Sequence, residues 1–273
     1  MAKFNAPFSY TGTVSNISVY KVRGSDTPIV RTKGGPTKRQ IKTKPSFEIT
    51  RKNNMEFGGR AKIAGQVLYA LRPLKYLGDY NTAGPLNSLF IPIQELDTEH
   101  EKGERNIVLS KNPGLLQGFN LNRRTPFDTI VANPLAYTLS KETLTASITF
   151  PALIPGINFF VPEKYPWYKF IVIVGTVEDM FYDSKGYQPQ RGYGKEMNSW
   201  VLEESDWMTV HAGAPAVSKQ YTKLGDCYGG VAEIAKLSSY SLLLAVGIAF
   251  GTMQKGQIEM VKYVGGGKIL GMA

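Results

Sequence analysis

Apolar residues recur at helical spacing in residues 45–96 and at strand spacing in most of the chain beyond them. A first helix is predicted between Pro45 and Pro73, with Ser46 as its N-cap and Pro73 as the residue that ends it. Its apolar residues lie three and four positions apart, which places them on one stripe of the helix. The stripe predicted to be buried consists of Phe57, Ala61, Ala64, Leu68 and Leu71, widened by Ile63, Val67 and Ala70.

A second helix is predicted shortly after the first. Pro85 suits its first turn, and Pro92 is expected to kink its middle. We expect the two helices to form a hairpin that also lies on a sheet, because two helices alone bury too little apolar surface to be stable. The apolar positions that define this second helix are Leu86, Leu89, Phe90, Ile93 and Leu96. The charged residues 97–105 that follow predict an exposed boundary.

From residue 107 onwards, β-branched and aromatic residues follow a period of two, and prolines and glycines separate the runs. This pattern is typical of an antiparallel β-sandwich. Residues 171–174 and 242–246 are continuously apolar, so these strands are expected to be covered on both faces. The predicted strands are residues 107–109, 136–139, 143–150, 170–177, 207–210, 240–250 and 257–264, with Ile269 and Leu270 as a further candidate.

Near the N-terminus, residues 11–35 alternate as strands do, and Gly24, Ser25 and Asp26 supply a turn, so a β-hairpin is predicted there. The expected fold class is α+β, mainly β with a helical insertion. We divide the chain into a basic N-terminal arm with a β-hairpin (1–45), a helical hairpin (46–100) and an antiparallel β-sandwich domain (101–273).

Positive charge is concentrated at the N-terminus. The chain of 273 residues has a formal net charge of +10, yet residues 1–75 carry 15 Lys and Arg against 3 acids, and the remainder carries 17 against 19. Such a segment binds a polyanion, contacts an acidic face of a partner, or is merely solvated. The densest part, which we call the basic segment (residues 33–44), is predicted to be a linker and holds five cations: Lys33, Lys38, Arg39, Lys42 and Lys44.

A second unusual stretch, a loop predicted at residues 183–199 with Tyr182 and Trp200 at its ends, mixes tyrosines with glycines and cations. Tyr187, Tyr193 and Trp200 are therefore candidates for stacking on bases or for contact with a partner. The alternative is that these aromatic side chains pack back onto the sandwich.

Catalytic patterns are scarce. The only histidines are His100 and His211, the single cysteine is Cys227, and no pair has metal-ligand spacing. The run of three glycines before Lys268 does not match a phosphate loop and predicts a strand end or a close backbone contact. The carboxylates at positions 203, 204 and 206 lie between tryptophans on an expected edge and are interpreted as solvated charge.

The sequence therefore predicts no catalytic residue, no metal, no cofactor and no enzymatic activity. A carbohydrate-binding or enzymatic sandwich that uses Trp167, Trp200 and Trp207 stays an alternative.

The N-terminal residues contain no apolar signal-peptide core, and no apolar run reaches the roughly 18 residues of a membrane span. We therefore expect a cytoplasmic protein without a membrane span, with release by a signal-independent route left open.

Several strings resemble those of an uncharacterised protein family found in Bacteroidota, a domain of unknown function. They are residues 12–20, 29–35, 53–60, 103–105 and 116–119, so that the resemblance mainly covers the first 130 residues. It implies a bacterial origin and no established activity.

These observations favour a non-enzymatic, structural, self-assembling protein, a homo-oligomer or larger assembly that associates through its basic N-terminal hairpin and its sheet edges. The alternative is a nucleic-acid-binding protein that uses the basic N-terminal quarter.

Overall fold

The computed structural model describes residues 10–21, 27–32, 34–161, 164–189, 200–221 and 239–273, together with the backbone of residues 2–3. The chain divides into two compact units, Met1–Arg51 and Lys52–Ala273. We call them the N-terminal unit and the main unit. The division falls within a long helix, α2 (Glu48–Ala70).

The N-terminal unit contains a small antiparallel sheet with the strand order β1-β4-β3-β2. The predicted hairpin is present as β3 and β4, whereas the turn expected at residues 24–26 lies outside the described residues. Ser15 and Asn16 form a further turn between β2 and β3, with Ser15 at φ 52°. The four strands are β1 (Ala2–Lys3), β2 (Gly12–Val14), β3 (Ile17–Tyr20) and β4 (Ile29–Thr32).

A short helix interrupts the basic segment, where the sequence pattern predicts a linker. Helix α1 (Lys38–Thr43) begins with a capping box, in which Thr37 and Gln40 bond each other's backbone N–H groups. A 3₁₀ turn, η1 (Pro45–Phe47), then leads into α2. Ser46 lies inside this turn, so its prediction as the N-cap of the long helix is wrong.

The predicted helical hairpin is confirmed as α2 and α3 (Ala83–Glu95), joined through a 3₁₀ turn, η2 (Arg72–Leu74), that contains Pro73. The predicted stripe is partly wrong, because Phe57 and Ala61 are exposed. The buried face of α2 therefore lies on another side of the helix, which includes Gly59. This glycine packs against another element. The buried residues of α2 are Glu56, Gly59, Ile63, Ala64, Gln66, Val67 and Ala70.

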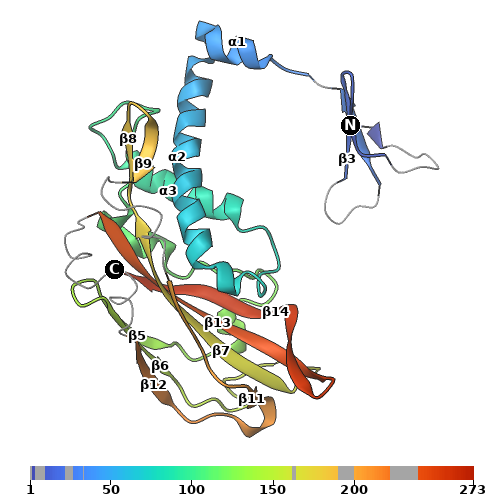
Figure 1. The fold of residues 1–273 in the computed structure, drawn as a ribbon, viewed down its shortest axis with the longest axis vertical. Coiled ribbons are helices and arrows are strands. Elements are labelled where there is room, and N and C mark those ends of the chain that lie inside the picture. Colours follow the sequence, from blue (N-terminus) through green and yellow to red (C-terminus); the bar gives the residue numbers. More distant parts are fainter. Residues whose placement is uncertain are drawn as a thin grey trace. The chain divides into compact units, whose positions relative to one another are not determined.

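Two antiparallel sheets form the sandwich (Figure 1). The larger has the order β10-β7-β13-β14, with β11 also pairing β7, and the smaller has the order β12-β6-β5. A separate hairpin consists of β8 (Met180–Asp183) and β9 (Gly186–Pro189). The sheet strands are β5 (Ala136–Ser140), β6 (Thr145–Phe150), β7 (Trp167–Glu178), β10 (Trp200–Glu204), β11 (Met208–Thr209), β12 (Val217–Tyr221), β13 (Tyr240–Gln254) and β14 (Gln257–Met272).

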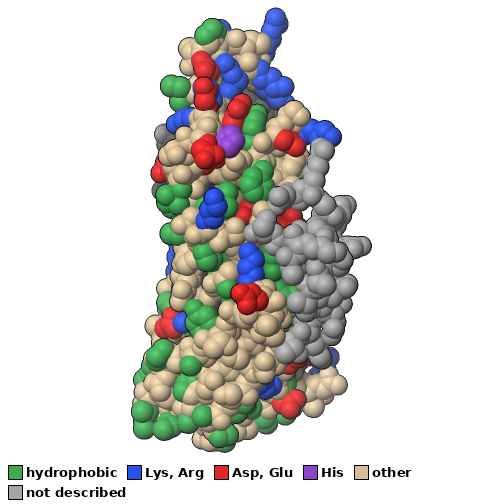
Figure 2. All heavy atoms as spheres, turned by 90° about the vertical axis from the view of Figure 1, so that its left-hand side faces the viewer, with side chains coloured by type: hydrophobic (Ala, Val, Ile, Leu, Met, Phe, Trp, Pro, Cys, Tyr) green, Lys and Arg blue, Asp and Glu red, His purple; other side chains and the backbone are tan. Residues whose placement is uncertain are grey.

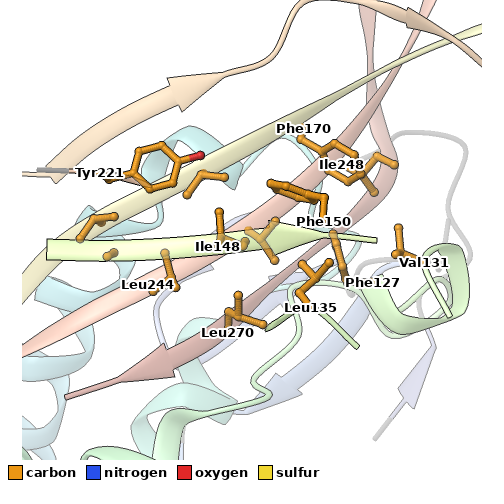
Figure 3. Close-up of a cluster of buried hydrophobic side chains, with 14 of the residues drawn as sticks. Phe127, Val131, Leu135, Ile148, Phe150, Phe170, Tyr221, Leu244, Ile248 and Leu270 are labelled. Atoms are coloured by element: carbon orange, nitrogen blue, oxygen red, sulfur yellow. The ribbon is translucent and has the colours of Figure 1, made fainter. Parts of the chain in front are cut away.

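The larger sheet is buried on both faces, which confirms the expectation from its continuous apolar runs. On β13, Leu242 and Leu244 point into the core between the two sheets, which Figure 3 shows in part. Their neighbours Leu243 and Ala245 point into a second core under α2 and α3. The main unit is therefore three layers: helices, the larger sheet and the smaller sheet.

The segment expected to begin the β domain differs from the prediction. Ile107 forms only an isolated bridge to Met180, and η3 (Leu109–Lys111) follows it, because the chain here covers the helical side of the larger sheet. Ile269 and Leu270 continue β14 and form no separate strand. The connections contain three more single turns, η4 (Pro113–Leu116), α4 (Phe127–Ile130) and η6 (Val210–Ala212).

The three glycines before Lys268 lie within β14, where neighbouring atoms approach their backbone closely and leave no room for a side chain at Gly265 and Gly266. A Cβ atom at Gly265 would lie 2.1 Å from the carbonyl oxygen of Ile248, and one at Gly266 would lie 2.9 Å from Cα of Phe127. The prediction of a close backbone contact is therefore confirmed.

In the part of the chain that the structure describes, no helix combines the length and apolarity needed to cross a membrane.

Candidate functional site

Four of the five cations predicted as contact residues lie in or next to α1. The side chains of Lys38, Arg39, Lys42 and Lys44 are exposed, and none has an ion-pair partner among the described residues. Lys33 lies outside the described residues.

The charges of α1 oppose its own stability. Lys38 and Arg39 occupy the first turn, where the helix dipole favours anions, and no acidic residue is present there. Lys38 and Lys42 are one turn apart, so that two like charges are neighbours on the same face. The helix has six residues and buries none of them. An anionic surface would relieve this repulsion.

Of the aromatic candidates, Tyr187 is not available for stacking. Its side chain is 4% exposed and lies in the core between the helices and the larger sheet, where its ring also packs edge-on against Tyr182. Tyr187 is therefore no stacking candidate, and the alternative of packing back onto the body is realised at this position. Trp200, the first residue of β10, is half-buried against the same core. Tyr193 lies outside the described residues.

Tyr187 belongs to a buried polar network that ties α2, α3 and the loop after α3 together. Its hydroxyl accepts a hydrogen bond from Gln94 Nε2 at 2.9 Å and donates to the carbonyl oxygen of Arg105 at 2.9 Å. Glu56 accepts from Arg105 Nε at 2.6 Å and from the Gly103 amide at 3.0 Å. We call these residues the Glu56 network.

The ionised form of Glu56 is favoured despite its burial. Burial alone would raise the pKa of this carboxyl, but hydrogen bonds from Arg105 and the Gly103 amide, with the charges of Arg105 and Arg60, lower its pKa below the ordinary value. Arg60 Nη1 lies 3.9 Å from Glu56 Oε2 and donates to Gln94 Oε1. The sequence pattern places Arg105 in an exposed boundary, whereas the structure gives it a structural role.

A groove opens between β10 of the larger sheet and β12 of the smaller sheet. We call it the edge groove. Both strands are terminal in the described strand order of their sheets. Its volume is about 330 Å³. The floor is apolar and is formed by Phe150, Leu153, Phe170, Val172 and Met208.

Acidic side chains line the β10 side of this groove. The described lining contains three carboxylates, Glu203, Glu204 and Asp206. It also contains one cationic side chain, Lys219 of β12. Glu204 also pairs with Lys169 of β7. Glu203 and the β12 residue Tyr221 line the same groove, and burial, followed by the charge of Glu203, raises the pKa of Tyr221 to about 12. These three carboxylates, expected to be solvated charge on an edge, therefore form one side of a groove.

Two adjacent buried carboxyl groups lie at the end of β7, where Glu178 is the last residue of the strand and Asp179 follows it. Burial raises the pKa of Glu178 to about 7, and the neighbouring Asp179 adds to this shift. Burial also raises the pKa of Asp179, although the amide and hydroxyl of Ser110 donate to it at 2.9 and 2.5 Å. Sequence reasoning missed both residues, and only their position after an apolar strand could have indicated them.

A second groove, of about 310 Å³, contains Asp97 and His100 at the end of α3. The imidazole Nδ1 of His100 lies 2.9 Å from Asp97 Oδ2, and the carboxylate also accepts from the amides of Glu99 and Asn106. Burial would raise the pKa of Asp97, but these hydrogen bonds lower it. A histidine surrounded by acidic side chains is visible on the face drawn in Figure 2. The contacts of Asp97 with His100, Glu99 and Asn106 stabilise the turn after α3.

Among the described residues, no three His, Cys, Asp or Glu side chains come together in a way that could hold a metal ion. His211 is exposed in η6, and Cys227 lies outside the described residues.

Comparison of the chain with protein-family models, with curated proteins and with solved structures gave no match. The resemblance to a Bacteroidota family therefore stays a prediction.

Proposed function

We propose that this protein is a non-enzymatic structural protein whose copies associate with one another through the basic N-terminal unit and the sheet edges. The single observation that carries the proposal is that few apolar side chains are buried among the described residues of the N-terminal unit. Among its described side chains, Val19 is the one buried hydrophobic residue, whereas Val14 and Ile17 are 61% and 42% exposed.

A sheet of such short strands needs a further surface to be stable. Ordering one residue costs about 1–2 kcal/mol of backbone entropy, and small sheets offset this cost only by burying a hydrophobic face. The described strands of the N-terminal unit have two to four residues. Contact with another copy would supply the missing apolar and anionic surface.

The charge balance of the two units supports the same proposal. The N-terminal unit carries 10 Lys and Arg against 2 acids, a net charge of +8, which leaves 22 against 20 in the main unit. The main unit is thus close to neutral, at +2, so that contact of the N-terminal unit with an acidic patch on another copy would reduce the repulsion among its cations and should weaken as salt is added.

The proposal is tested by sedimentation velocity of the full chain over a hundredfold range of concentration. We expect the mass to rise with concentration. In the segment variant, Lys38→Gln, Arg39→Gln, Lys42→Gln and Lys44→Gln together, we expect monomers at concentrations where the unmodified chain associates.

A matched control removes the same number of exposed cations from the main unit: Lys75→Gln, Lys102→Gln, Arg124→Gln and Lys185→Gln. This control should associate as the unmodified chain does. A chain that stays monomeric at the highest concentration and at low salt would contradict the proposal.

Nucleic-acid binding is the second candidate, and the four exposed cations of the basic segment that the structure describes favour it. If they contact four phosphates, the logarithm of the association constant should fall with the logarithm of salt concentration with a slope of about −3.6 for a duplex and about −2.8 for a single strand. Fluorescence anisotropy with a labelled duplex and a labelled single strand measures this slope. Absence of binding at low salt, or equal binding by the segment variant, would remove this candidate.

A further inference from the structure

We propose that the edge groove of the main unit is the docking site for the basic segment of a second copy of this chain. The inference rests on the proposed function and specifies which surface receives the N-terminal unit.

The groove has the form of a site for a peptide segment. Its floor is made of aromatic and aliphatic side chains, including Phe150 and Phe170, whose ring centroids lie 4.4 Å apart. Figure 3 shows both rings and Tyr221 in the same buried cluster between the sheets. Two strands that are terminal in the described strand order flank this floor, so that an added segment could pair with either of them.

The carboxylates of the edge groove determine that it attracts a positively charged segment. Glu203, Glu204 and Asp206 give the described lining a charge of −3, and Lys219 reduces it to −2. A cationic segment is therefore attracted, whereas the same acidic edge of another copy is repelled, which disfavours symmetric pairing of two β10 strands. The basic segment, which has five cations and no acid over residues 33–44, is the most cationic stretch of the chain and is complementary to this rim.

The course of α2 within the main unit favours a second copy over the same copy. Gln66 bonds the backbone of Glu178, and Leu74 and Leu77 reach Gly247, which pairs with Ile171. Helix α2 thus runs antiparallel to β7, and its residues from Lys52 onwards extend past the end of that strand.

The groove lies at the opposite end of β7 from the point where the chain enters the main unit. From Lys52 to Gln66 the helix covers about 21 Å, at about 1.5 Å per residue. From Glu178 back to Val172, which lines the groove, the strand covers about 20 Å more, at about 3.3 Å per residue. The groove also faces the smaller sheet, whereas α2 covers the other face of the larger sheet. Residues that precede Lys52 in the same chain would have to cover this distance to reach the groove, whereas those of a second copy would not.

Contact between the basic segment of one copy and the edge groove of the next joins two different surfaces. Such a heterologous contact leaves one free segment and one free groove at the ends of every open assembly, so that copies add head to tail into a ring or an open filament.

The test uses charge reversal in the full chain. The reversed-segment variant carries Lys38→Glu, Arg39→Glu and Lys42→Glu. The reversed-groove variant carries Glu203→Lys and Asp206→Lys, and leaves the Glu204 pair with Lys169 intact. Each variant alone should associate at least tenfold more weakly than the unmodified chain. An equimolar mixture of the two should recover association, because each then meets a complementary surface.

The control for the groove reverses two exposed acids elsewhere in the main unit, Glu142→Lys and Glu259→Lys, and should associate normally. If the reversed-groove variant associates as strongly as the unmodified chain while the reversed-segment variant does not, the groove assignment is overturned and the proposed function stands. If the unmodified chain does not associate at all, the proposed function itself fails.

A cross-linking measurement keeps the proposal falsifiable if a variant folds poorly. A photoreactive phenylalanine analogue at the exposed groove residue Val217 is introduced into ¹⁵N-labelled chain, which is then mixed with unlabelled chain. We expect cross-links from the labelled groove to unlabelled residues 33–44. Cross-links confined to one isotopic form, or directed to another region, overturn the proposal.

Discussion

The ring of Tyr187 on β9 lies directly against the backbone of Gly59 on α2. A Cβ atom at Gly59 would lie 2.6 Å from Cδ1 of Tyr187, which is closer than side chains approach in proteins. The absence of a side chain at Gly59 therefore lets the β8–β9 hairpin close on the helix. A glycine that weakens the helix locally is required by a contact between residues 59 and 187, which lie far apart along the chain.

Gly59→Ala should consequently destabilise the protein, although alanine is the better helix former. We expect the free energy of unfolding to fall by about 1–3 kcal/mol, because the methyl group overpacks this contact. Gly65→Ala is the matched control on the same helix, where no atom lies within 4 Å of the added methyl group. It should raise the free energy of unfolding by up to about 1 kcal/mol. Urea denaturation of both variants measures the difference, and equal shifts would contradict the contact.

The Tyr187 hydroxyl should contribute to stability through its hydrogen bonds with Gln94 and Arg105. Tyr187→Phe is expected to lower the free energy of unfolding by about 1–2 kcal/mol, because it leaves buried polar groups with one partner fewer. Tyr69→Phe, at an exposed tyrosine of α2, should have almost no effect in the same urea titration. If Tyr187→Phe leaves the free energy of unfolding unchanged, the hydroxyl contributes nothing to the Glu56 network and the prediction is contradicted.

Glu56 should be the most sensitive member of that network. Its side chain is 4% exposed, and Glu56→Gln would leave Arg105 without its charged partner, for which we expect a loss of about 3 kcal/mol. Glu101→Gln is the control, since Glu101 pairs with Lys52 at 3.5 Å on the surface and should matter by less than about 0.5 kcal/mol. Thermal and urea unfolding of both variants compare the two pairs, and similar losses would be inconsistent with the buried arrangement.

Stability should depend on pH through Glu178. Its pKa is raised in the folded state to about 7, so the folded protein binds this proton more tightly than the unfolded chain does. The resulting stabilisation is fully present below the ordinary pKa of 4.5 and is lost as the pH rises through about 7. Asp179, whose pKa is also raised, acts in the same direction.

We therefore expect the melting temperature to fall between pH 5 and pH 8, and Glu178→Gln to make that dependence shallower. Glu142→Gln, at an exposed position, should leave the slope unchanged. An unchanged slope in Glu178→Gln, measured by calorimetry across this range, would show that this carboxyl is not the group that titrates.

Where the side-chain pattern is local, the elements follow from it directly. The strands β5, β6, β7 and β13 begin and end within a few residues of their predicted positions, because alternation or continuous apolarity marks them. The helical hairpin was predicted for the same reason. The short strands β8, β9 and β12 were missed, since their few residues show little alternation of apolar and polar side chains.

By itself, the sequence determined the fold class, the two-sided burial of the larger sheet, the concentration of positive charge at the N-terminus and the close approach around the three glycines of β14. Only the tertiary structure decided that Tyr187 is a core residue, that Glu56 and Arg105 form a buried pair and that two sheet edges meet to form a groove. The physical reason is range: propensity and periodicity act between residues a few positions apart. Burial of a polar group depends instead on partners distant in the sequence, as for Glu56 with Arg105 and for Gln94 with Tyr187.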